Sequence, residues 1–453
     1  MGFIDSSVTS IALPAIRASL GGTLSAASWV AGAYFLTLSS LILVGGAMGD
    51  RFGVVRVYRF GILTFVASSA LCMLAQSMGQ LNMARALQGI GAAFMVPGSM
   101  TLIARAYPRA ERGAALGLWA AGASATTAFG PVLGGVLLTL GGPEVWRVIF
   151  ALNLPLGAAS LWLLARYTIP DQGRPGTPID ILGAGLAALA LGLFATALTR
   201  EKDSLWLLAP SALAIGLFLV REAMAAAPMI RLGMFANRSF ALANLATLFL
   251  YVAMTGVMFY LPMTAISAWG ISPIGVTAAF LPTSLMIFSL SAPMGRLADR
   301  HGPGILMAGG SLCVALGYGL LAWNAPGGQF WGRIVPIMVL VAFGLAAVIA
   351  PLTAAVMRFA PDSEQGAASG INNALARASG LISVALMGAV ARISYGPVTP
   401  DHPGFGLPYT GTGHALATSA GFGRIAALAA ILALFASLLS ALMARQKEAA
   451  PGS

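Results

Sequence analysis

Long apolar runs separated by short polar segments set the pattern of this 453-residue chain. The runs at residues 205–220 and 425–443 are continuous and lack the alternation of apolar and polar positions that a membrane β-strand requires. An α-helix needs about 20 apolar residues to cross a hydrocarbon core about 30 Å thick. Because backbone polar groups in lipid must be paired within the chain, the runs predict membrane-spanning helices.

Fourteen such spans are predicted, so the fold class is an all-α membrane protein. The spans are residues 1–16, 28–49, 57–75, 81–104, 113–140, 145–165, 181–198, 205–220, 240–262, 274–297, 305–323, 334–357, 367–390 and 425–443. At ~1.5 Å rise per residue the first helix would be only about 24 Å long. We therefore expect that the natural start lies upstream or that this helix is truncated. The polar segment 394–418 predicts a solvated outer loop.

Composition and charge narrow the class of protein. Hydrophobic residues make up 58% of the chain, charged residues make up 9%, and the mean hydropathy is +0.86, which excludes a soluble protein. The net charge of +11 does not indicate nucleic-acid binding, because the cations stand singly in many short loops. Sixteen loop cations fall on one side of the predicted spans and seven, Arg17 among them, on the other. The positive-inside rule predicts that the first side, with both termini, faces the cytoplasm.

Two loop motifs recur along the chain. Gly46-Ala-Met-Gly-Asp50-Arg51-Phe-Gly53 returns as Gly295-Arg-Leu-Ala-Asp299-Arg300-His-Gly302, and residues 108–113 return at 361–366. The similar offsets indicate a duplicated half, and transporters built from repeats bind substrate between the repeats near the bilayer midplane. We predict a six-helix bundle at residues 1–166, two inserted helices at 180–222 and a second six-helix bundle at 240–443.

Charged and polar residues inside the apolar spans are the candidate chemistry. Asp5 and Arg85 lie where a charge costs about 2.5–3.5 kcal/mol on insertion scales, so they mark a functional site by default. Gln88, close to Arg85, and Asn373 are candidates to line a cavity. Arg377 either lines that cavity or faces the cytoplasmic end of its span.

These residues resemble a known family. The chain is similar over essentially its whole length to the fourteen-helix drug:proton antiporters of the major facilitator superfamily, which implies two six-helix bundles plus two additional central helices. The two loop copies match the family's Gly-x-Leu-Ala-Asp-Arg-x-Gly-Arg-Lys, with Val54 and Val55 in place of the basic pair. The resemblance implies a gating role for Gly46, Asp50, Arg51 and Gly53 and for Gly295, Asp299, Arg300 and Gly302. The alternative is a simple marker of the cytoplasmic side.

Further motifs carry the same resemblance. Arg85-Ala-Leu-Gln88-Gly89-Ile-Gly91 matches the family's fourth helix, and Ile4-Asp5 with Ala12-Leu13-Pro14 matches its first, although Ser10 replaces the usual Asn. The resemblance implies that Asp5 and Arg85 couple transport to protons. The alternative for Arg85 is a structural cation that reaches the outer membrane interface.

Two motifs of the fifth and sixth spans complete the resemblance. Gly130-Pro131-Val-Leu-Gly134-Gly135 matches the antiporter motif, in which a proline kinks the helix and glycines let a neighbouring helix approach. The stretch from Trp146 to Gly157 resembles the family's sixth helix. We interpret it as an aromatic interfacial anchor with structural polar contacts.

The sequence therefore predicts a secondary transporter, not an enzyme, that expels a hydrophobic or amphipathic compound while protons enter. It carries no phosphate loop, no nucleophile motif and no histidine pair with metal-ligand spacing, so no metal or other cofactor is expected. One alternative is proton-coupled transport of an organic anion or siderophore-like compound, because two intramembrane arginines face one clear carboxylate. A remote alternative is a non-transporting membrane sensor or a membrane enzyme.

The expected partners follow from that function. They are a small-molecule substrate, protons and the bilayer of the plasma (inner) membrane, without nucleic acid. The family resemblance adds a periplasmic adaptor and an outer-membrane channel as further partners of such a pump.

Overall fold

The computed structural model is all-helical, and it describes residues 1–108, 111, 122, 130, 132–167, 173–174, 176, 179–200, 204–226, 228–361, 364–396, 404–407 and 411–445. Within these ranges, twelve helices are long and apolar enough to cross a membrane. Two shorter apolar helices, Val8–Leu20 and Val132–Gly141, lie where the first and fifth spans were predicted. The prediction of an all-α membrane protein is confirmed.

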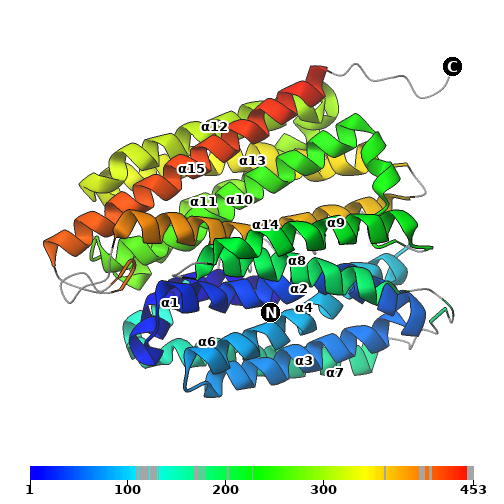
Figure 1. Ribbon diagram of the computed structural model, residues 1–453, viewed down its shortest axis with the longest axis horizontal. Coiled ribbons are helices and arrows are strands. Elements are labelled where there is room, and N and C mark those ends of the chain that lie inside the picture. The colour runs from blue at the N-terminus through cyan, green and yellow to red at the C-terminus, as the bar shows by residue number, and fades with distance from the viewer. Residues whose placement is uncertain are drawn as a thin grey trace.

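The helices form two groups with a helix pair beside them (Figure 1). The first group is α1 (Gly2–Leu20), α2 (Leu24–Phe52), α3 (Val54–Leu74), α4 (Met78–Ala106), α6 (Trp146–Ala151) and α7 (Asn153–Tyr167). The pair is α8 (Ile181–Thr199) and α9 (Leu208–Met224). The second group is α10 (Arg238–Ser267), α11 (Pro273–His301), α12 (Pro303–Asn324), α13 (Val335–Arg358), α14 (Gln365–Tyr395) and α15 (Thr412–Arg445).

The two copies of the loop motif share one backbone geometry. Gly53 ends α2 and begins α3 with φ 97° and ψ 131°, and Gly302 ends α11 and begins α12 with φ 84° and ψ 142°. Residues with a side chain rarely adopt a positive φ, so a glycine stands at the same point of both turns. The repeat read from the sequence is therefore also a repeat in backbone structure.

Several helices run beyond the apolar runs that predicted them. α14 ends at Tyr395 and α15 begins at Thr412, so the prediction of a solvated loop over 394–418 is wrong for the first two and the last seven of those residues. His414 is fully buried, and its Nδ1 lies 2.7 Å from the Tyr395 hydroxyl. This polar pair lies inside the bundle, which a hydropathy pattern cannot indicate.

The predicted sixth span is one of the twelve, Trp146–Tyr167, and a turn at Leu152 divides it into α6 and α7. Pro155 lacks a backbone N–H and its ring clashes with the carbonyl of Ala151, one turn earlier, which interrupts the helix. Asn153 and Trp146 are both buried beside this break. The interpretation of Trp146 as an interfacial anchor is therefore wrong, because its ring packs inside the first group of helices.

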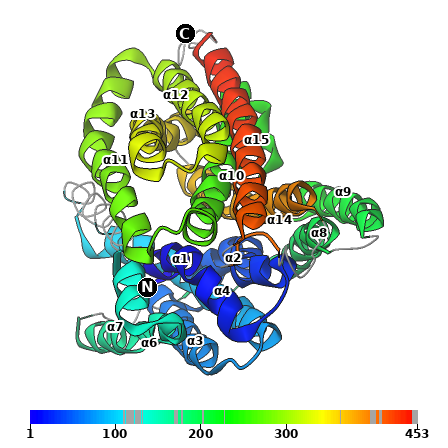
Figure 2. The ribbon, with the colours of Figure 1, turned by 90° about the vertical axis from the view of Figure 1, so that its left-hand side faces the viewer.

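The helix pair α8–α9 lies along the seam between the two groups, beside α2 and α14 (Figure 2). Ala195 of α8 forms a small apolar cluster with Leu381 and Ala385 of α14, and Trp29 and Phe35 of α2 pack against it. The pair thus contacts both groups of helices at once.

Candidate proton and transport site

Two glycines of the fourth-helix motif let α4 lie directly against its neighbours. A Cβ on Gly91 would stand 2.6 Å from the backbone nitrogen of Phe65 in α3 and 2.9 Å from the carbonyl oxygen of Gly61. A Cβ on Gly89 would collide with the backbone of Tyr34 in α2. This close approach brings the polar side chains of α4 within reach of three other helices.

Arg85 and Asp5 meet at the centre of the first helix group. The Arg85 Nη1 donates to Asp5 Oδ2 in a salt bridge, and both side chains are at most 1% exposed. The Arg85 Nε donates to the carbonyl oxygen of Val30 in α2 at 2.8 Å. Arg85 also donates to Gln88 Oε1 on its own helix. The guanidinium is therefore held by three acceptors from three helices.

The carboxylate of Asp5 accepts from donors on two helices, α4 and α7. Its Oδ1 accepts from Gln88 Nε2 at 3.1 Å and from Asn153 Nδ2 of α7 at 3.3 Å. Gln88 Nε2 also donates to Ser69 Oγ of α3 at 2.8 Å. The network therefore joins α1, α2, α3, α4 and α7. A change of charge at Asp5 would alter hydrogen bonds that connect all five helices.

Aromatic rings enclose the Arg85 guanidinium. Its central carbon lies 4.6 Å from the centre of the Tyr34 ring and 5.7 Å from that of Phe150. Ring faces attract cations, and the attraction is largest where water is excluded. Because Arg85 is buried and paired, its role as a cation that reaches the membrane interface is contradicted.

A buried carboxylate paired with an arginine has two stable chemical states. When ionised, it neutralises the arginine, and when it binds a proton it can no longer do so. Removing one partner of a buried ion pair costs about 3–5 kcal/mol, because the other charge stays buried and uncompensated. A loss of the negative charge at Asp5 would therefore strongly affect Arg85 and the helices that hold it.

The comparisons with known proteins give the family. The model of the Major Facilitator Superfamily matches residues 1–385 and 243–452 of the chain. The chain belongs to the major facilitator superfamily. It is similar to the methylenomycin A resistance protein of Bacillus subtilis, with 32% identity over 87% of this chain and 85% of that protein. It is also similar to the multidrug resistance protein Stp of Mycobacterium tuberculosis, with 29% identity over 86% of this chain and 73% of that protein.

Solved structures agree on the fold. A bacterial homologue of the human lysosomal transporter Spinster, in an inward-facing and unoccupied conformation, matches with a TM-score of 0.70 over 98% of this chain and 94% of that chain, at 16% identity. The D-xylose-proton symporter matches with a TM-score of 0.62 over 95% of this chain and 94% of that chain, at 17% identity. The chain is thus an integral membrane transporter of a small-molecule substrate, not an enzyme.

In the transporter, the other cavity candidates lie on α14. Asn373 is half-buried and donates to the carbonyl oxygen of Ser369 at 3.0 Å. Arg377 is half-buried. Sequence reasoning missed the adjacent Asn372, which donates to Thr247 Oγ1 of α10 at 2.9 Å. Asn372 is one of two neighbouring asparagines in an apolar span, and only the structure distinguishes which of the two joins α14 to α10.

The loop motif of the transporter lies at the end of the bundle that holds the α15 C-terminus. Arg51 is exposed, and its guanidinium lies 5.3 Å from the Phe52 ring. The carbonyl oxygen of Asp50 accepts from the backbone N–H of Arg174 at 2.8 Å, so the segment after α7 lies against the first copy. In the second copy Gly295 and Arg300 lie on α11, and the Asp299 side chain is outside the described residues.

The antiporter motif packs against both helix groups. A Cβ on Gly134 would stand 2.6 Å from Val8 Cγ1 of α1, and a Cβ on Gly135 would stand 2.8 Å from the carbonyl oxygen of Pro273 at the start of α11. Gly130 is buried. Pro131, and with it the expected kink, lies outside the described residues.

Hydrogen bonds between the two groups of helices gather at one end of the transporter. We call this the turn end, because it holds the α1–α2 turn at residues 21–23; it lies on the left in Figure 1. Arg17 is 2% exposed and donates to the carbonyl oxygen of Phe405 between α14 and α15. Ser28 Oγ of α2 lies 3.3 Å from the Tyr260 hydroxyl of α10. Arg17 was expected in a loop, and its burial corrects that expectation.

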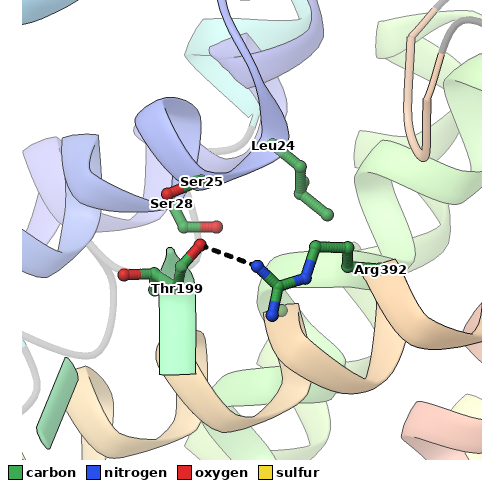
Figure 3. Close-up of a pocket in the computed structure, with 6 residues that line it drawn as sticks. Leu24, Ser25, Ser28, Thr199 and Arg392 are labelled. Carbon is green, nitrogen blue, oxygen red and sulfur yellow. Dashed lines mark hydrogen bonds between the residues drawn. The ribbon is translucent and has the colours of Figure 1, made fainter. Parts of the chain in front are cut away.

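The helix pair forms hydrogen bonds with both groups of helices at the turn end. Arg392 of α14 donates to the last carbonyls of α8, those of Leu198 at 3.4 Å, Thr199 at 3.2 Å and Arg200. Figure 3 shows the bond to Thr199. Trp29 Nε1 of α2 donates to Thr199 Oγ1 at 3.2 Å. Because the last carbonyls of a helix lack partners within it, a cation there is a favourable cap.

Proposed function

We propose that the transporter expels hydrophobic or amphipathic compounds in exchange for protons. Two observations support this. Its relatives include a methylenomycin A resistance protein and a multidrug resistance protein. The buried Asp5–Arg85 pair supplies a group that can hold a proton in one state and an ion pair in another.

The proposed coupling runs through the network around Asp5. Ionised Asp5 accepts from Arg85, Gln88 and Asn153 and favours the arrangement seen here. Protonated Asp5 leaves the Arg85 charge uncompensated, so this arrangement loses about 3–5 kcal/mol relative to one in which water or substrate reaches Arg85. A shift of that size changes the ratio of two conformations by roughly two to four orders of magnitude.

The proposed transport cycle alternates the open end of the protein. Contacts of Arg17 with Phe405, of Ser28 with Tyr260 and of Gly135 with α11 support a state closed at the turn end. We assign the turn end to the outside and the C-terminal end to the cytoplasm, so this state would face inward. The Asp50–Arg51 motif and its repeat would then form the inner gate, and Gly130, Pro131, Gly134 and Gly135 would seal the antiport seam.

The finer architecture belongs to the same proposal. The twelve long spans and the two shorter helices, Val8–Leu20 and Val132–Gly141, support fourteen crossings. The bundles would span residues 1–166 and 240–443, with 180–222 as the inserted pair and both termini in the cytoplasm. A cysteine introduced at Gly413, which is exposed, should react with a membrane-impermeant reagent in intact cells. Reaction only after lysis would reverse the orientation.

The organic-anion alternative loses part of its support. Its basis was an excess of intramembrane arginines over carboxylates, and Asp5 neutralises Arg85 in the structure. Arg377 would have to recognise the anion without help from Arg85.

The deciding experiment is substrate-driven proton movement in proteoliposomes. Purified transporter with a lipophilic cation or a neutral drug should release protons from the lumen when substrate is driven in, at a rate that depends on protein content. Liposomes with an organic anion should show no such flux. Substrate-driven flux without proton movement would refute the antiport proposal.

A further inference from the structure

The ends of α8 and α9 farthest from the turn end bring two buried carboxyl groups together. Asp180, the N-cap of α8, is 5% exposed, and Glu222, near the end of α9, is 2% exposed. A Cβ on Gly183 would stand 2.8 Å from Asp180 Oδ2 and 2.8 Å from Glu222 Oε1. The two oxygens therefore lie at most 5.6 Å apart, and both border a position that only glycine leaves empty.

The outward oxygen of each carboxyl group already has donors. Asp180 Oδ1 accepts from the backbone N–H of Gly183 at 2.9 Å and from Arg221 Nε and Nη2 at 3.2 and 3.1 Å. Glu222 Oε2 accepts from the backbone N–H of Ile230 at 2.6 Å. These bonds fix both carboxyl groups in place and leave the inward oxygens facing the same point.

The inward oxygens have no hydrogen-bond donor among the described residues. A buried acceptor without a partner costs about 1–3 kcal/mol, and more if it is charged. Arg221 balances one negative charge, so a second charge would remain uncompensated if both groups were ionised. The geometry therefore calls for one further positive charge between Asp180 and Glu222.

We propose that Asp180 and Glu222 form a second proton-binding site, in which one proton sits on Glu222 and leaves Asp180 ionised beside Arg221. A single proton from water removes the excess charge, and its release returns it to water. A metal ion would require several more oxygen ligands. No group of three or more metal-ligating side chains is present in the described part of the chain.

The site connects the helix pair to the second helix group. Ile230, held by Glu222, precedes Arg231, which forms a salt bridge with Glu364 at the start of α14. The charged groups that face Glu222 are Asp180 from α8 and Arg221 from its own helix. Loss of the proton would set two carboxylates against each other, so the ends of α8 and α9 should separate as the medium becomes alkaline.

Infrared difference spectroscopy of the purified full-length transporter tests the site without substrate. At pH 7 exposed carboxyl groups are ionised, so the wild type minus Glu222→Gln spectrum should contain the carbonyl band of one protonated carboxylic acid. The amide of this variant is neutral, as the protonated acid is, and has nearly the same size, so the fold should be kept. Wild type minus Glu144→Gln, an exposed carboxylate, should lack the band. Gly183→Ala, which pushes a Cβ between the two groups, should weaken it.

Three outcomes would overturn the inference. The first is a Glu222→Gln difference spectrum that holds only carboxylate bands at pH 7. The second is a band that disappears at constant pH when sodium replaces a bulky organic cation, because a metal ion would then occupy the site. The third is a band that persists in Glu222→Gln and Asp180→Asn but is lost in Asp5→Asn, which would place the proton at the first site. Asp180→Asn keeps the N-cap of α8, since asparagine caps as well as aspartate.

Discussion

Replacing Asp5 with Asn removes the negative charge of the buried pair and keeps nearly the same shape. Arg85 would retain the Val30 carbonyl and Gln88 as acceptors but lose its only ionic partner among the described residues. Breaking one side of a buried pair costs about 3–5 kcal/mol, and the two remaining acceptors favour the lower end, about 3 kcal/mol. Proton-driven uphill export should disappear, while substrate binding remains.

A double-mutant cycle separates the ion pair from other effects of the substitution. Arg85→Gln alone should also destabilise the protein, whereas the double variant lacks both buried charges and should lose less than the two single losses together. We expect a coupling of at least about 2 kcal/mol in the free energy of unfolding, within the range for contacting residues. Proton flux in proteoliposomes gives the functional readout. Strictly additive stability losses, or wild-type coupling in Asp5→Asn, would refute the reasoning.

Two further predictions concern the seams between the helix groups. Gly135→Leu should separate the fifth-span segment from α11, because a Cβ there already stands 2.8 Å from the Pro273 carbonyl oxygen, and proton leak without substrate should rise. Gly319→Leu, where nothing lies within 4 Å, should leave the leak unchanged, and equal leak in both variants would contradict the seam. Arg392→Gln should lower the free energy of local opening at the last turn of α8 by about 2 kcal/mol. Amide hydrogen exchange near Thr199 should then be roughly thirtyfold faster. Unchanged exchange there would mean that Arg392 does not hold α8.

The sequence predicts the spans well because lipid imposes one rule on every helix. Each helix must be apolar for about 20 residues, so the runs locate the helices even where their ends are off. The predicted helix ends differ from those in the structure where polar residues are paired inside the protein and the helix therefore continues past the apolar run. The start of α15 at Thr412 and the buried His414 are examples, since the Tyr395 hydroxyl replaces water there.

The candidate site could be predicted only in part. Asp5 and Arg85 stand out because each is a charge in an apolar run, but their mutual contact joins residues 80 positions apart. Asn153 and Arg17 carry no such signal. Arg17 looks like any cation at a helix end, and its burial depends on the Phe405 carbonyl, 388 residues away. Glu222 beside Arg221 likewise has the pattern of an exposed helix end.

The position of α8–α9 makes the two sides of the molecule different, because the helix pair covers one of the two seams between the helix groups. A protein built from two similar halves has two long seams that run between them from one membrane surface to the other. The helix pair lies along the seam of α2 and α14 and packs an apolar cluster into it. In a bilayer, acyl chains would meet the helix pair there instead of the seam, and a lipid-dissolved compound would have to approach the interior from another side. The duplicated sequence thus gives a protein with two similar helix groups but two different lipid-facing sides, one covered by α8–α9 and one not.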